Sequence, residues 1–134
     1  MNIDTNEKIF IAGSTGMVGS SIKRILLKRL SNRKGSSEIL CPNRKELDLL
    51  NYENVSRWFK ENKPSIVIIA AAKVGGILAN STMPYEFLLE NIKIQNNIIE
   101  NSWKYGAKKV LFLGSSCIYP KFSQQPIKEE YLLD

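Results

Sequence analysis

Three glycines in the first part of the chain have the spacing of a nucleotide-binding turn. They lie between an apolar run, residues 8–12, and a stretch of helical period, residues 17–30. A glycine turn in that context can wrap a dinucleotide's diphosphate, which the amides and dipole at the helix start attract. Gly13 would form the tight turn, Gly16 would let the backbone approach the diphosphate, and Gly19 would let the helix pack closely. The alternative is an ordinary strand-to-helix turn. The predicted cofactor-binding residues here are Gly13, Ser14, Thr15, Gly16, Met17, Val18 and Gly19.

The end of the second apolar run indicates which dinucleotide binds. NAD-selective folds place an acidic residue there, but this chain has Arg44, and Glu38 lies at the opposite end of the run. Because a guanidinium can bind a 2'-phosphate through two hydrogen bonds, we predict NADP as the cofactor. A surface ion pair between Arg44 and Glu46 is the alternative. Asp48 would accept a hydrogen bond from the adenine amino group, cap the next helix, or both. Leu49 is also a predicted cofactor-binding residue.

The periodicity of apolar residues predicts four strands alternating with helices. Strands are expected at residues 8–12, 38–41, 66–70 and 109–113, and helices at 17–30, from 51 or 53 to 62, and at 84–105. Beyond Pro120 the chain reads as irregular. The residues expected to face the core of the first helix are Val18, Ile22, Ile25 and Leu26, and both tryptophans, Trp58 and Trp103, are expected to pack inward.

Strands that are apolar on both faces and alternate with helices predict a doubly wound α/β domain, a parallel sheet covered on both sides. Ligands of such sheets bind at the carboxyl ends of the strands. The loops after Ala12, Cys41, Ala70 and Leu113 are therefore the expected site.

Composition excludes several classes of protein. The 134 residues are 43% apolar, enough for one folded domain, and contain no apolar stretch of membrane-spanning length. Residues 1–8 are polar, unlike a signal peptide, so we expect a soluble, cytoplasmic protein. Two distant cysteines and no histidine argue against a zinc site or a disulfide framework.

The net charge of +6 has two interpretations. In the first, most of the positive charge lies on a solvated helix face and the turn after it. In the second, the positive charge attracts a ligand rich in phosphate. The aromatic residues suggest no nucleic-acid stacking surface. The basic residues in question are Lys23, Arg24, Lys28, Arg29, Arg33 and Lys34.

Several motifs in order, from Lys8 onward, resemble the GDP-L-fucose synthases, a family of extended short-chain dehydrogenases/reductases. Residues 70–80 (AAAKVGGILAN) resemble the loop after a central strand of that family, and residues 114–120 (GSSCIYP) resemble its catalytic serine segment. Gly-Met-Val-Gly at 16–19, RKELDL at 44–49 and the Glu90-Asn91 pair add to the resemblance.

The resemblance implies epimerisation of GDP-4-keto-6-deoxy-D-mannose at carbons 3 and 5, then reduction of the 4-keto group by NADPH. It assigns Ser115 to the 4-keto oxygen and Cys117 to acid/base catalysis, and it places Asn91 near the active site. Taken alone, Cys117 would be a small core residue, Ser115 and Ser116 a plain loop, and Lys73 a solvated lysine. The implied cofactor contacts are Ala70, Ala71, Ala72, Leu113, Gly114, Ser115 and Ser116, and the implied sugar contacts are Lys73, Val74, Gly75 and Gly76.

The sequence also departs from that family. The catalytic Tyr-x-x-x-Lys pair and a later histidine should follow Asp134, and the nucleotide-sugar domain is absent. We therefore expect residues 1–134 to form an incomplete NADP-binding Rossmann domain, inactive alone, with an exposed sheet edge. Some members carry a basic residue in the glycine turn where this chain has Ser14 and Thr15, which leaves more of the NADP selectivity to Arg44.

Three further hypotheses remain open at this stage. The chain could belong to another nucleotide-sugar epimerase or dehydratase, against which Cys117 and residues 74–76 argue. It could instead be a non-catalytic NADP-binding or interaction module. Since members of the family commonly pair through long helices, residues 84–105 would contribute to a homodimer.

Overall fold

The computed structural model describes residues 6–31 and 35–133, so most of the polar start and the basic residues Arg33 and Lys34 lie outside the described residues. The four predicted strands and three predicted helices are present, with bounds within one residue of the prediction, whereas the short helix Ile77–Thr82 was not predicted. In chain order they are β1 (Lys8–Ala12), α1 (Met17–Leu30), β2 (Glu38–Leu40), α2 (Tyr52–Asn62), β3 (Ile66–Ile69), α3 (Ile77–Thr82), α4 (Pro84–Lys104) and β4 (Lys109–Phe112), followed by short 3₁₀ turns at Ser116–Ile118 and Glu129–Leu133.

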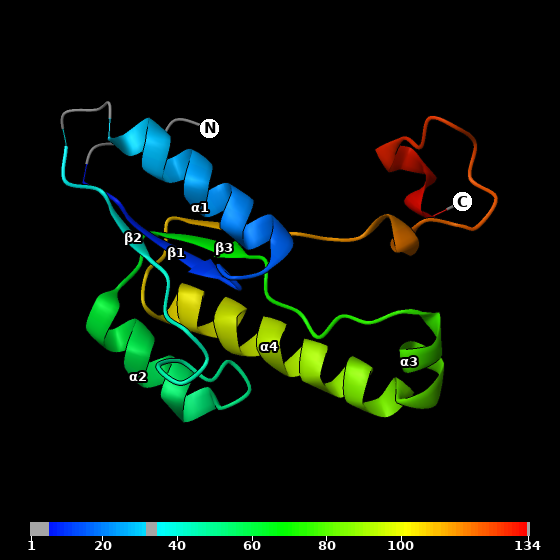
Figure 1. Cartoon of the computed structure of the whole chain (residues 1–134), viewed down its shortest axis with the longest axis horizontal. Coiled ribbons are helices and arrows are strands. Elements are labelled where there is room, and N and C mark those ends of the chain that lie inside the picture. The colour runs from blue at the N-terminus through cyan, green and yellow to red at the C-terminus, as the bar shows by residue number, and fades with distance from the viewer. Residues whose placement is uncertain (1–5, 32–34, 134) are drawn as a thin grey trace.

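All strands are parallel, in the order β2-β1-β3-β4. Figure 1 shows α1 on one face of the sheet and α2 and α4 on the other. Alternate side chains of β1 therefore enter different cores: Ile9 and Ile11 pack with Leu26 of α1, and Phe10 packs with Phe59 and Ile98 from α2 and α4. The predicted doubly wound α/β fold is confirmed.

Two predictions about helix faces are wrong. On α1, Val18 and Ile25 are 46% and 52% exposed. The predictions for Ile22 and Leu26 are confirmed, and together with Gly19 these residues, which recur every three or four positions, form the face that meets the sheet.

The prediction for the tryptophans holds for only one of them. Trp58 stacks against Phe10, with ring centroids 4.5 Å apart, whereas Trp103 is 84% exposed. Trp103 lies on the outer side of α4 because Ile98 and Asn101, which are fully buried, define its inner side. Apolar character alone did not distinguish the two sides of this helix.

The fourth strand also differs from its prediction. Each residue of β4 is exposed, although the run is apolar. The strand is at the sheet edge, paired on one side with β3, and the helices described here cover β1 and β3. The predicted exposed edge is thus present, and the prediction that all strands are covered on both faces is wrong for β4.

Candidate functional site

A cavity of about 720 Å³ opens at the carboxyl edge of the sheet. The loops after β1, β2 and β3 form its walls, and α4 closes one side, as expected for a ligand site of a parallel sheet. Among the predicted site residues, those that line it are Gly13, Ser14, Thr15, Gly16, Met17, Val18, Arg44, Leu49, Ala70, Ala71, Ala72, Lys73 and Val74.

Two glycines of the first loop are required by packing. Gly13 has φ +80°, and a β-carbon on it would lie 2.7 Å from the carbonyl oxygen of Ala70. A β-carbon on Gly19 would lie 2.1 Å from the carbonyl oxygen of Gly13, so the helix can approach the loop only because the side chain is absent. At Gly16 the nearest atom is 3.4 Å away, which a methyl group would tolerate.

The start of α1 has the polarity of an anion site. Gly16 is its N-cap residue, no side chain caps the helix, and the first turn holds no acidic residue. The amides of the first turn have no acceptor within the helix, and Gly16, Met17 and Val18 line the cavity. The helix start therefore presents backbone donors and a positive dipole to this space.

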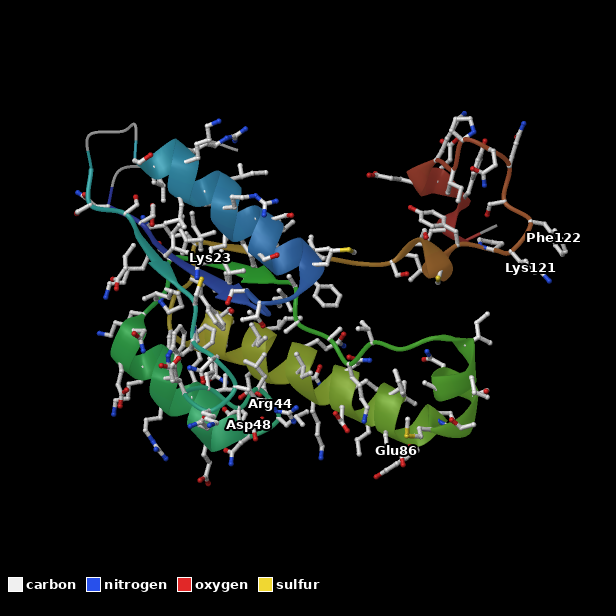
Figure 2. The ribbon with its side chains drawn as sticks, viewed as in Figure 1. Lys23, Arg44, Asp48, Glu86, Lys121 and Phe122 are labelled. Carbon is white, nitrogen blue, oxygen red and sulfur yellow. The ribbon has the colours of Figure 1, made fainter. Side chains whose placement is uncertain are left out.

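Arg44 also lines the cavity, from the turn after β2 (Figure 2). The predicted alternative, an ion pair with Glu46, is not found within the ranges 6–31 and 35–133. The Glu46 carboxylate instead accepts from the backbone N–H of Asn43 at 2.7 Å. Arg44 thus lines the cavity without an ion pair to Glu46.

Asp48 does not cap the next helix, so that alternative is wrong. Asn51 is the N-cap residue of α2, and its side chain accepts from the N–H of Asn54. The Asp48 carboxylate accepts from the N–H of Leu50 at 3.1 Å, and Asp48 does not line the cavity. Its suggested contact with adenine stays a prediction.

The loop after β3 is held against α4. The side chain of Asn91 accepts from the N–H of Lys73 at 2.7 Å and donates to its carbonyl oxygen at 3.0 Å. The Lys73 ammonium lies 2.6 Å from the Glu90 carboxylate and 5.5 Å from the centre of the Phe87 ring. Lys73 is therefore an anchored side chain, not a freely solvated loop lysine.

Some of the predicted sugar contacts line the cavity and others do not. Val74 lines the cavity, but Gly75 and Gly76 do not. Gly75 packs against Phe87, whose ring atom would lie 2.7 Å from an added β-carbon, and Gly76 is the N-cap residue of α3.

The serine segment is not brought into the cavity. The N–H of Leu113 donates to Ile69, so the segment starts beside β3, but none of residues 113–117 lines the space. The Ser115 hydroxyl accepts from the N–H of Cys117 at 3.2 Å, and both side chains are exposed. Figure 1 shows the chain leading away from the sheet beyond β4.

Sequence reasoning missed some cavity residues because their types carry no chemical signal or their position depends on the fold. Apolar residues next to a glycine loop read as core, and Glu90 reaches the cavity only because α4 lies beside the loop after β3. The missed residues are Phe10, Ala12, Pro42, Asn43, Leu47, Leu50, Glu90 and Ile94.

One sequence pattern invites a false assignment. Tyr105 and Lys109 have the Tyr-x-x-x-Lys spacing. Lys109 starts β4, at the edge of the sheet opposite the cavity, and the Tyr105 hydroxyl is hydrogen-bonded to Ser56 at 3.0 Å. These two residues are not a catalytic pair for this site.

Two kinds of feature are absent from the described part of the chain. No helix there is both long enough and apolar enough to cross a bilayer. No three acidic, cysteine or histidine side chains gather there as a metal-binding group would.

Known proteins resemble this chain over nearly its whole length. It is 49% identical over 127 residues to a GDP-L-fucose synthase of Sinorhizobium fredii and 48% identical over 130 residues to GDP-L-fucose synthase 1 of Arabidopsis thaliana. These matches cover 95% and 97% of the chain but only 38% and 39% of the relatives' lengths.

A solved structure gives the same result. A GDP-mannoheptose C4 reductase from Campylobacter jejuni with NADP bound superposes with a TM-score of 0.87 at 40% identity, over 98% of this chain and 40% of that one. Residues 9–134 match the NAD dependent epimerase/dehydratase family. On this match, together with the parallel sheet and the glycine loop, the chain belongs to the NAD dependent epimerase/dehydratase family.

Proposed function

We propose that the chain binds NADP in the cavity at the carboxyl edge of the sheet. The observation that carries this proposal is the pairing of an uncapped helix start, suited to a diphosphate, with Arg44 at the other side of the same space. The space also suits the cofactor because Gly13 and Gly16, which both line it, bring no side chain into it. The similar reductase with NADP bound supports the choice of dinucleotide.

Replacing Arg44 with alanine tests this directly. A charge-assisted, bidentate contact is lost, so NADPH should bind at least about tenfold more weakly while NADH affinity stays unchanged. Fluorescence titration with each dinucleotide measures both constants. Arg57→Ala removes the same charge from the exposed side of α2 and should change neither. Equal losses for NADPH and NADH on Arg44→Ala would remove the case for NADP.

We further propose that this chain is the cofactor-binding part of a GDP-L-fucose synthase, an activity that two similar proteins carry in their names. The whole reaction, conversion of GDP-4-keto-6-deoxy-D-mannose to GDP-L-fucose, is proposed for a polypeptide of the relatives' length. NADPH would supply the hydride for the 4-keto carbon. The Ser115 hydroxyl would donate to the 4-keto oxygen, the Cys117 thiol would move a proton at the epimerised carbons, and residues 74–76 would border the sugar.

Exchange of substrate protons separates these roles. In a polypeptide of the relatives' length, Cys117→Ser should abolish deuterium incorporation at carbons 3 and 5 in D₂O and leave NADPH affinity unchanged. The 134-residue chain should give no product above a cofactor-only blank, because its serine segment stands outside the cavity. NADPH binding without turnover even in the longer polypeptide would favour a non-catalytic NADP module.

The outer side of α4 supports a further part of the proposal, a homodimer. Its exposed apolar residues recur every three, four or seven positions and form one stripe: Tyr85, Leu88, Ile92, Ile99 and Trp103. In an antiparallel pair of α4 helices centred near residue 94, the two ends of the stripe face each other, as a two-fold interface requires. Glu86, on the outer side of α4 in Figure 2, then comes near Lys104 of the second copy.

Sedimentation equilibrium tests the homodimer. Trp103→Glu should convert dimer to monomer, because it buries a carboxylate in the apolar stripe. Ile25→Glu makes the same kind of change on the exposed side of α1 and should leave the mass unchanged. A wild-type chain that stays monomeric at high concentration contradicts this part of the proposal.

The compartment follows as a weaker part of the same proposal. The two cysteines, Cys41 and Cys117, are free thiols, as in proteins of a reducing compartment. Together with the NADP proposal this favours the cytoplasm.

A further inference from the structure

We propose that Glu46 is a positioning residue for recognition of the cofactor's 2'-phosphate: its carboxylate closes the turn that presents Arg44. This inference rests on the proposed binding of NADP. It gives a role to an acidic residue that would otherwise be expected to weaken binding of a phosphate next to it.

The turn at residues 43–47 is closed from both ends. The Asn43 side chain accepts from the N–H groups of Lys45 at 2.9 Å and Glu46 at 3.3 Å. In return, the Glu46 carboxylate accepts from the N–H of Asn43 at 2.7 Å. The N–H of Leu47 also donates to the carbonyl oxygen of Asn43, at 2.9 Å. This reciprocal arrangement is a capping box, normally found at the first turn of a helix.

Here the capping box stabilises a single turn with no helix after it. A lone turn is unstable in water because one or two hydrogen bonds must fix several residues. The carboxylate of Glu46 and the amide of Asn43 therefore supply much of what holds this turn. Arg44 and Lys45 lie between them in the sequence, so the direction of their side chains depends on the box.

Arg44 and Glu46 of the turn line different spaces. Arg44 lines the large cavity, whereas Glu46 lines a separate, smaller space of about 310 Å³ with Trp58 and Asn62. Leu47, the residue after Glu46, is only 3% exposed and packs in the core with residues of α2 and α4. Glu46 itself does not line the large cavity, and its carboxylate is bonded to the N–H of Asn43, where it supports the turn.

This arrangement reverses the sign expected from charge alone. If Glu46 acted on the phosphate only through its charge, its removal would tighten NADPH binding, since like charges repel. If it holds the turn, removal of the acceptor must weaken NADPH binding even though the site becomes more positive. Glutamine separates the two effects because it loses the charge and keeps an acceptor suited to a capping box.

The experiment measures NADPH and NADH dissociation constants for Glu46→Ala and Glu46→Gln in the 134-residue chain, with thermal unfolding of each variant. We expect Glu46→Ala to weaken NADPH roughly fivefold, the change that loss of a cap of about 1 kcal/mol implies, and to leave NADH unchanged. Glu46→Gln should bind NADPH as tightly as the wild type or more tightly. Asn43→Ala should reproduce the selective loss, and Asn43→Ser, which keeps a capping hydroxyl, should restore affinity.

Glu61→Ala is the matched control, because it removes one carboxylate from the exposed side of α2, outside the turn. The positioning role is overturned if Glu46→Ala tightens NADPH, if Glu46→Ala and Glu46→Gln change it equally, or if NADPH and NADH weaken together. Selective loss of NADPH on Arg44→Ala without any effect of Glu46→Ala removes this inference and leaves the proposed function intact. A wild-type chain that binds neither dinucleotide removes both.

Discussion

The amino ends and the carboxyl ends of the parallel strands, which form the amino edge and the carboxyl edge of the sheet, are built in opposite ways. At the amino edge, polar side chains join the strand starts: the N–H of Glu7 donates to Ser37, and the N–H of Lys8 donates to the Ser65 hydroxyl. The Lys108 ammonium lies 2.9 Å from the Glu7 carboxylate, which is 6% exposed although Lys108 is 68% exposed. This edge is closed by side chains and is held together by pairs far apart in the sequence.

At the carboxyl edge, backbone takes the place of side chains. Gly13, Gly16 and Gly19 leave the loop bare, α1 has no capping side chain, and the cavity of about 720 Å³ opens between the loops. At the start of α1, backbone amides are left available. The comparison indicates that the amino edge serves stability alone, whereas the carboxyl edge combines packing with binding, so substitutions at the amino edge should change stability without changing binding.

Gly19→Ala should have the largest effect and is expected to change stability and binding together. Its β-carbon would meet the backbone of Gly13 at 2.1 Å, which cannot move without displacing the loop. We expect a loss of about 3 kcal/mol in unfolding free energy, together with loss of NADPH binding. Urea denaturation and dinucleotide titration measure the two effects.

Gly16→Ala is the matched comparison at the same loop. The added methyl group would lie 3.4 Å from its nearest neighbour, so the unfolding free energy should stay within about 0.5 kcal/mol of wild type. NADPH affinity should still fall, because the methyl group projects where the diphosphate is proposed to approach. Large destabilisation by Gly16→Ala would contradict the distinction drawn here between packing and binding glycines.

The glycine loop after β1 shows what sequence alone could predict. Local spacing was enough to predict the glycine turn and the succession of strands and helices along the chain. It also predicted the edge at which the cavity lies, because parallel strands align their carboxyl ends. Arg44 at the cavity was predicted from the end of its strand. In each case the signal lies within a few neighbouring residues.

What sequence could not predict depends on distant partners. The pairing of Glu7 with Lys108 spans 101 positions, and the approach of Glu90 to Lys73 requires α4 to lie beside a loop that precedes it. The exposure of Trp103 depends on which side of α4 meets the sheet, and apolar residues occur on both sides. Separation of the serine segment from the cavity likewise depends on the path of the chain beyond β4, which neighbouring residues do not determine.

Ser65→Ala tests the closed edge and should have a smaller effect than Gly19→Ala. The Ser65 hydroxyl accepts from the N–H of Lys8 at 3.1 Å, and its one proton is shared between the carbonyl oxygen of Lys8, also at 3.1 Å, and the Glu7 carboxylate. Loss of these bonds should lower the unfolding free energy by about 1 kcal/mol, a fall in Tm of about 4 °C. NADPH affinity should not change, since the cavity is at the other edge. A fall in affinity without a fall in Tm would mean that the two edges are not independent.

The pH dependence of stability should give the smallest effect, and it identifies the contribution of one charged group, the Glu7 carboxylate. Hydrogen bonds from Ser65 and Lys108 hold the pKa of Glu7 below its ordinary value of 4.5, against the opposing effect of burial. Because the folded chain favours the ionised carboxylate, this contribution is fully present above pH 4.5 and is lost as the pH falls through the lowered pKa. Glu7→Gln should therefore have a lower Tm than wild type near pH 7, and the difference should shrink as the pH falls below 4.5. Thermal melts of both proteins across that range measure it, and a difference that stays constant with pH would show that Glu7 acts through packing and not through its charge.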